Sequence, residues 1–196
     1  MRINDIKFDF DDIVIVPKKN TAIRSRSIIK PFDNLGALPL FTAPMTSVVD
    51  DNNYREFIAN KINVVFPRTI DYDKSINLLI KDKELFSESF FSYGLFDFQH
   101  TFVNAHKNSI VPQHVLIDVA NGHMVEILEL VRVAKKRRSH LIIMVGNIAN
   151  PETYEWYAQS NLIDYVRIGI GNGNGCLTTK QTGVGFPKAS LINECY

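Results

Sequence analysis

The chain has 196 residues, 45% of them hydrophobic, which is enough for one domain with a substantial core. Its 22 basic and 21 acidic residues leave a net charge of +1, so the overall charge favours neither nucleic acid nor an anionic membrane surface as a partner. The longest hydrophobic runs are far shorter than the roughly 20 residues of a membrane-spanning helix, and the N-terminus lacks the hydrophobic segment of a secretory signal. Two cysteines without zinc-like spacing are typical of a cytoplasmic protein with reduced thiols.

Short hydrophobic runs alternate with amphipathic segments along the chain. The runs predict six strands, in the order 39–45, 63–66, 90–95, 114–120, 141–148 and 165–170. The segments between them predict helices over 51–60, 72–83, 98–106 and 123–137, and two more that begin near Pro151 and Pro187. Each strand is thus followed by a helix.

The composition of the strands indicates the fold class. The segment Leu141–Val145 is hydrophobic throughout, which is typical of a strand covered on both faces of a parallel sheet. Strands and helices in alternation, without hairpin signals, indicate βαβ units. A doubly wound open sheet and a (β/α)8 TIM barrel both fit this pattern. A complete barrel takes about 250 residues, so a barrel would be truncated after the sixth βα unit. No linker divides the chain, and we expect a single, partial barrel domain over 1–196.

A glycine-rich loop follows the last predicted strand. Gly169, Gly171, Gly173 and Gly175 lead directly to Cys176. Glycine permits positive φ and a close backbone approach, so peptide groups can turn toward a bound ion or phosphate. Backbone dipoles near a thiol favour the thiolate, which is the attacking form of cysteine. The spacing does not match the G-x-G-x-x-G dinucleotide fingerprint.

The alternative for a cysteine near glycines is an inert, packed side chain. We predict this for Cys195, in the helix near the end of the chain, and a reactive role for Cys176.

Motifs in the same order along the chain resemble the IMP dehydrogenase/GMP reductase family. The segment Gly171–Thr178 is similar to the catalytic loop G-P-G-S-x-C-x-T, and Lys180–Pro187 is similar to the K-x-T-G-V-G-Y-P of GMP reductases. Further matches are Phe10–Pro17, Ser25–Ser27, Pro39–Val48, Ile117–His123 (I-D-V-A-N-G-H) and Gly146–Ile148. The resemblance covers essentially the whole chain and implies a (β/α)8 barrel enzyme.

The resemblance implies a reaction at C2 of a purine nucleotide monophosphate. Cys176 would form a covalent thioimidate at C2 of GMP; ammonia would leave, and hydride from NADPH would give IMP. Thr178 would assist proton transfer together with an acidic partner, a glutamate that in GMP reductases lies beyond residue 196. An NAD-dependent IMP dehydrogenase that makes XMP and lacks the regulatory domain is the alternative.

The resemblance also implies further site residues. Asp118 and Asn147 would contact the nicotinamide side of the cofactor, although Asp118 could instead cap the following helix. Met45 would lie against the purine, and Gly171, Gly173 and Asn174 would contact the nucleotide. The carbonyls of Gly171, Gly173 and Cys176 match positions that hold a monovalent cation, K+, in family members. His123 is a candidate contact at the mouth of the site.

Some positions depart from the family pattern. Asn172 and Asn174 replace proline and serine, and Thr46 replaces aspartate, so phosphate and ribose recognition would differ. The segment between Phe66 and Phe90 is too short for the CBS-type regulatory insert of the dehydrogenases, which favours a GMP reductase.

Two expectations concern assembly and charge. By resemblance the protein would be a homo-oligomer, a tetramer, or a second chain would complete the barrel. The rival to both the GMP reductase and the IMP dehydrogenase is a non-catalytic remnant that binds a nucleotide. The basic cluster Lys135–Arg138 could mark nucleic-acid binding, but at a helix end it favours interaction with the helix dipole.

Overall fold

A parallel five-stranded sheet forms the centre of the molecule. The computed structural model describes all residues except 1–5, 35, 69–71, 83–88, 107–108 and 172–176. The strands pair in sequence order, and all pairs are parallel. They are β1 (Val64–Phe66), β2 (Ser89–Tyr93), β3 (His114–Asp118), β4 (Ile142–Ile148) and β5 (Tyr165–Ile168). The sheet and its crossover helices confirm the α/β class, in the form of an open half-barrel.

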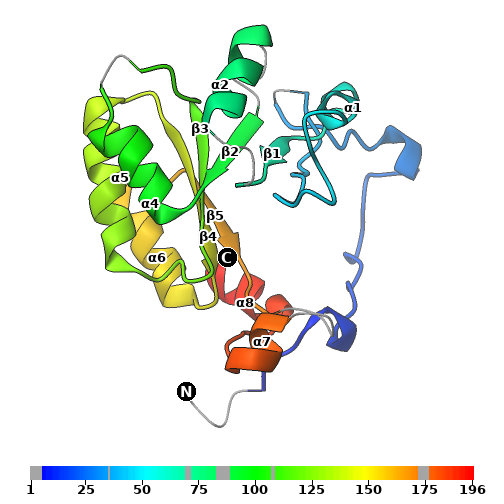
Figure 1. The fold of residues 1–196 in the computed structure, drawn as a ribbon. Helices are drawn as coiled ribbons and strands as arrows, with labels where there is room; N and C mark the ends of the chain where they lie inside the picture. The colour runs from blue at the N-terminus through cyan, green and yellow to red at the C-terminus, as the bar shows by residue number, and fades with distance from the viewer. Residues whose placement is uncertain (1–5, 35, 69–71, 83–88, 107–108, 172–176) are drawn as a thin grey trace.

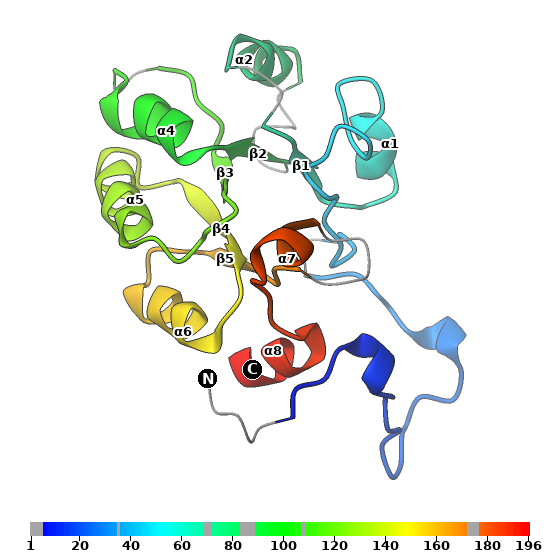
Figure 2. The same cartoon turned by 60° about the horizontal axis from the view of Figure 1, so that its bottom comes forward.

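Helices surround the outer face of the sheet. In Figure 2, α1 (Tyr54–Ala59), α2 (Tyr72–Lys81), α4 (Leu95–Phe98), α5 (Val125–Arg137) and α6 (Pro151–Ser160) form an arc outside the strands. A π-helical segment, η3 (Gln99–Asn104), continues α4. Beyond β5, α7 (Leu177–Thr182) and α8 (Lys188–Cys195) lie below the sheet in Figure 1. The sequence did not predict α7, because its polar residues have no hydrophobic period.

The first predicted strand is not a strand in the structure. The segment 39–45 forms a single parallel bridge, between Phe41 and Asn63. Beyond the bridge, the Thr42 side chain replaces backbone pairing, and its Oγ1 accepts from the backbone N–H of Val65 at 2.8 Å. Pro39 and Pro44 have no N–H to donate, so the ladder cannot extend through them. The segment therefore lies beside β1, held by side-chain as well as backbone hydrogen bonds.

Two hydrophobic layers lie on the two faces of the sheet. On β4, Ile143 and Val145 are fully buried against the helices, while Met144 packs on the inner face. The inner layer contains Val65, Phe90, Leu116 and Met144. Burial on both faces explains why these strands are hydrophobic throughout and confirms the expectation for a helix-covered parallel sheet.

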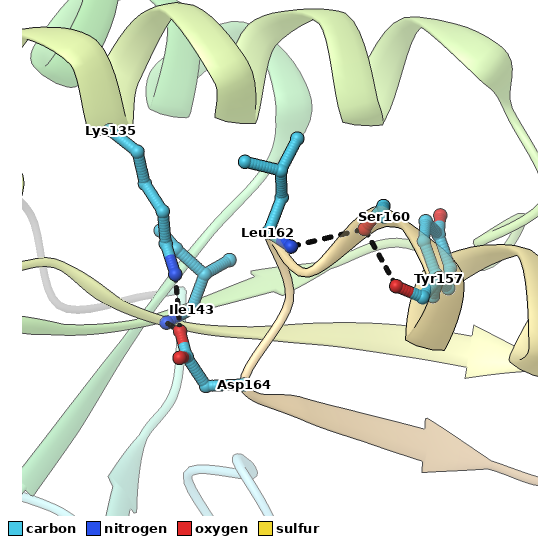
Figure 3. Close-up of polar contacts among 6 residues, drawn as sticks. All are labelled: Lys135, Ile143, Tyr157, Ser160, Leu162 and Asp164. Carbon is cyan, nitrogen blue, oxygen red and sulfur yellow. Dashed lines mark hydrogen bonds and ion pairs between the residues drawn. The ribbon is translucent and has the colours of Figure 1, made fainter.

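A polar junction fixes the start of β5 against β4 and α5 (Figure 3). The Oδ2 of Asp164 accepts from Lys135 Nζ and from the backbone N–H of Ile143, both at 2.7 Å.

Arg138, at the end of α5, is buried and donates to the carbonyls of Phe102 and His106. Lys135 and Arg138, two residues of the basic cluster, are therefore bound within the fold.

The N-terminal segment runs apart from the sheet (Figure 1). It contains two short 3-10 helices, η1 (Phe10–Asp12) and η2 (Arg26–Ile28), and it touches α8 where the N–H of Ser190 donates to the carbonyl of Phe8 at 3.1 Å. In the part of the chain that the structure describes, no helix has the length and hydrophobicity to cross a membrane.

Candidate active site

A cavity of about 310 Å3 lies at the carboxyl ends of the strands, where parallel α/β folds bind their ligands. Its walls come from the ends of β3 and β4, from the segments that follow β1, β3 and β5, and from the first turn of α7. The lining residues are Arg68, Asp118, Val119, Ala120, Asn147, Gly169, Ile170, Gly171 and Thr178. Four of the predicted site residues, Asp118, Asn147, Gly171 and Thr178, are therefore brought together, although they come from three separate motifs.

Asp118 ends β3 and is paired with two arginines. Its Oδ1 accepts from Arg167 Nη1 at 2.9 Å, and its Oδ2 lies 3.3 Å from Arg68 Nε. The alternative of a helix cap is wrong, because α5 begins after Met124 without a side-chain cap. Two guanidinium groups around one carboxylate leave a net charge of +1 in this wall and hold the carboxylate in a fixed orientation.

Asn147 is held by both of its neighbouring strands. Its side-chain Nδ2 donates to the carbonyl of Gly169 at 2.8 Å, and its N–H donates to the carbonyl of Val119 at 2.9 Å. Its own carbonyl accepts from the N–H of Gly122 at 2.9 Å. A Cβ on Gly122 would lie 2.6 Å from that carbonyl oxygen, so only glycine allows this approach. Since Nδ2 is engaged, Oδ1 is the side-chain atom left to accept from a ligand.

The glycine loop packs directly on α7. Gly171 has a φ of +80°, and a Cβ there would lie 1.5 Å from Thr179 Oγ1. Thr178, one residue earlier on the helix, is exposed and lines the cavity. Gly173, Asn174 and Cys176 lie outside the described residues, so their predicted roles, including that of the carbonyls in a K+ site, stay predictions. In the described part of the chain, no three His, Cys, Asp or Glu side chains converge on a metal site.

Two predicted residues do not reach the cavity. Met45, at the end of the 39–45 segment, is 56% exposed and is absent from the cavity wall. His123 lies between the β3–α5 loop and α6, where its Nδ1 pairs with Thr153 Oγ1 at 2.7 Å. His123 is therefore not part of the cavity wall, and its contact with the mouth stays a prediction.

Cys195 behaves as predicted for a packed thiol. It is partly buried at the end of α8, and burial together with the adjacent Glu194 raises the pKa of its thiol. A raised pKa disfavours the thiolate at neutral pH.

Sequence reasoning missed Arg68 and Arg167. Arg167 lies inside the short strand β5, and Arg68 follows β1 by two residues. A charged residue within a hydrophobic run, at a position facing the barrel interior, was the available signal for Arg167. Arg68 had no comparable signal, because its contact with Asp118 joins residues that are 50 positions apart in a 196-residue chain.

Comparisons with known proteins agree with this geometry. Residues 104–196 match the profile of the family described as "IMP dehydrogenase / GMP reductase domain". A GMP reductase of Lactobacillus gasseri is 31% identical over 91% of this chain and 54% of its own length. GMP reductase 2 of Bos taurus is 30% identical over 98% of this chain and 58% of its own length.

The fold is also similar to a solved enzyme structure. The crystal structure of inosine 5'-monophosphate dehydrogenase from Legionella pneumophila superposes with a TM-score of 0.75 at 23% identity, covering 97% of this chain and 59% of that one. The chain thus spans a little over half the length of the relatives it matches. The motif-based prediction of the family is confirmed: residues 104–196 match the IMP dehydrogenase / GMP reductase domain, and nearly the whole chain aligns with GMP reductases.

Proposed function

We propose that this chain carries the purine and nicotinamide sites of a GMP reductase, which converts GMP and NADPH to IMP, ammonia and NADP. One observation carries the proposal. The cavity at the strand ends collects Asp118, Asn147, Gly171 and Thr178, which the family motifs had singled out. This chain spans only part of the length of the relatives it matches. The activity of a whole GMP reductase is therefore a proposal.

The reactive cysteine belongs to a short segment whose described ends both line the cavity. Gly171 and Thr178 flank the residues that carry Cys176. In the proposed reaction, the Cys176 thiolate attacks C2 of GMP and forms a thioimidate while the amino group leaves as ammonia. Thr178 is placed on the exposed first turn of α7, where its hydroxyl can relay a proton to the leaving amine.

The other wall of the cavity provides polar groups for a carboxamide. Asp118 accepts hydrogen bonds and is oriented by Arg68 and Arg167, while Asn147 offers Oδ1. The N–H2 group of a nicotinamide carboxamide can donate to these oxygens, and its carbonyl can accept from the arginine N–H groups of the same wall. NADPH would supply the hydride that adds to C2 of the thioimidate, after which the C2–S bond breaks and gives IMP and the free Cys176 thiolate.

The assay follows the absorbance of the reduced cofactor with GMP plus NADPH and, in parallel, with IMP plus NAD. We expect oxidation of NADPH in the first pair, its loss in Cys176→Ser, and unchanged activity in the matched control Cys195→Ser. Turnover of IMP with NAD alone would show the dehydrogenase instead. Nucleotide binding without turnover in either pair would show the non-catalytic remnant.

Two further properties belong to the same proposal. We infer a K+ ion at the carbonyls of Gly171, Gly173 and Cys176, and activity should fall when Na+ replaces K+ at constant ionic strength. We also infer a homo-oligomer, a tetramer, in the cytoplasm. Light scattering tests this assembly, and a monodisperse, stable monomer would contradict it.

A further inference from the structure

We propose that His123 is a positioning residue that fixes, through the turn after β4, the orientation of Asn147 in the cavity. The inference deepens the proposed function and rests on it where the nicotinamide ligand is concerned. Its structural part concerns two loops, 119–124 between β3 and α5 and 149–150 between β4 and α6, and is testable without any ligand.

His123 joins the two loops through both ring nitrogens. Its Nε2 accepts from the backbone N–H of Ala149 at 3.0 Å, and its Nδ1 lies 2.7 Å from Thr153 Oγ1, in the first turn of α6. Its own N–H donates to Asn121 Oδ1 at 3.2 Å. The imidazole therefore connects the β3–α5 loop with the turn after β4 and with the start of α6.

The hydrogen bonds determine the tautomer of the ring. Since Nε2 accepts from an N–H group, it carries no proton, and in the neutral ring Nδ1 is protonated and donates to Thr153 Oγ1. Partial burial lowers the pKa of His123, in agreement with a neutral ring. A protonated imidazole has no acceptor and cannot keep the bond to Ala149.

The contacts of this loop lie directly beside Asn147, which lines the cavity. Ala149 is two residues after Asn147, and Gly122, the residue before His123, donates to the Asn147 carbonyl at 2.9 Å. Two consecutive residues of one loop, Gly122 and His123, thus hold the chain at the Asn147 carbonyl and at the Ala149 N–H. With the backbone fixed in this way, the Asn147 side chain can keep its 2.8 Å bond to the carbonyl of Gly169.

The charged groups around the two loops do not replace the imidazole. Glu126 and Glu152 lie in the exposed first turns of α5 and α6. Asp118 is paired with the two arginines, and the Tyr157 hydroxyl donates to the Gly122 carbonyl. Among the described residues, none of these groups bonds to the ring of His123. The Nε2 atom therefore accepts its hydrogen bond from the Ala149 N–H.

The test compares His123→Leu with His123→Gln in the full chain. Leucine has neither ring nitrogen, whereas the Gln Oε1 can accept from Ala149, so glutamine is the conservative rescue. Proton-detected nitrogen spectra of the imidazole should show the Nδ1–H tautomer in the unmodified protein. In His123→Leu, exchange of the Ala149 N–H and of the Asn147 side-chain amide should rise about tenfold, the equivalent of one hydrogen bond. Both should stay within about threefold in His123→Gln.

A second readout links the loops to the proposed ligand. His123→Leu should weaken NADPH binding about tenfold and change GMP binding by less than about twofold. Faster exchange throughout the sheet, for example at Phe91, would show a merely structural role and overturn the inference, as would an Nε2–H tautomer or unchanged exchange at Asn147. If the unmodified protein binds neither nucleotide, the proposed function fails, but the tautomer and exchange results still decide the positioning role.

Discussion

Arg167 and Asp118 form a 2.9 Å ion pair that crosses over the strand between them. Asp118 on β3 pairs in register with Gly146 on β4, and Gly146 pairs with Arg167 on β5. Asp118, Gly146 and Arg167 thus form a row across three strands. The ion pair passes over Gly146, the residue of this row that has no side chain. A Cβ on Gly146 would lie 2.5 Å from the Cβ of Arg167. The wall of the cavity thus depends on a glycine in the middle strand.

Substitution of Gly146 by alanine should disturb this row. We expect Gly146→Ala to lower the free energy of unfolding by about 1–3 kcal/mol, because the added methyl group displaces Arg167. The matched control is Gly94→Ala, since a Cβ on Gly94 would meet its nearest neighbour at 3.5 Å, an ordinary contact distance. Urea unfolding of both variants measures the difference, and equal losses would contradict the steric explanation.

The two arginines should differ in their coupling to Asp118. Arg167 is the closer and less exposed partner, with 29% of its side chain accessible against 56% for Arg68. Double-mutant cycles with Asp118→Asn, Arg167→Met and Arg68→Met should give a coupling energy of about 1 kcal/mol for Arg167 and about 0.5 kcal/mol or less for Arg68. A larger coupling for Arg68 would show that the exposed pair dominates.

Tyr157 should titrate at unusually high pH. Burial raises the pKa of Tyr157 to about 12, and its hydroxyl donates to the carbonyl of Gly122. Since the folded-state pKa lies above the ordinary value of about 10, the stabilisation is complete below that value and is lost as the pH rises toward 12. Absorbance titration should show one tyrosine of the seven ionising near pH 12.

The Tyr157→Phe variant is the control for this titration. It should lack the late transition and lose about 1–3 kcal/mol of unfolding free energy, because the Gly122 carbonyl loses its donor. A late transition that persists in the variant would assign it to another tyrosine.

The stability of the two loops should fall in mild acid. Burial lowers the pKa of His123, so the unfolded chain binds a proton before the folded protein does. Stability from the neutral ring is complete above the ordinary histidine value of about 6.5. It is lost as the pH falls from that value to the lower folded-state pKa. Unfolding measured between pH 7.5 and 5 should show this slope, and His123→Gln should reduce it.

The junction at Asp164 should contribute more through its backbone contact than through its ion pair. Asp164→Ala removes the acceptor for the Ile143 N–H and for Lys135, and should cost about 1–3 kcal/mol of unfolding free energy. Lys135→Met removes only the cation and should cost about 1 kcal/mol or less. Thermal unfolding compares the two variants. A cost for Lys135→Met equal to that for Asp164→Ala would contradict this order.

The sequence by itself determined the elements and the motifs. Hydrophobic runs such as 141–148 and amphipathic segments such as 123–137 predicted strands and helices, because burial on two faces and on one face leaves different periods in the chain. The motifs located Asp118, Asn147, Gly171 and Thr178, which the structure collects around one cavity. Local chemistry also predicted the inert environment of Cys195.

Only the tertiary structure decided which polar groups meet. The pairing of Asp118 with Arg167 depends on strand register, and its pairing with Arg68 depends on the curvature that brings β1 and β3 to one cavity. The pairing of His123 with Thr153 and the exposure of Met45 depend in the same way on loops packed by distant residues. Such contacts join positions tens of residues apart, and no period or propensity along the chain encodes them, because they arise only when the sheet and its helices are assembled.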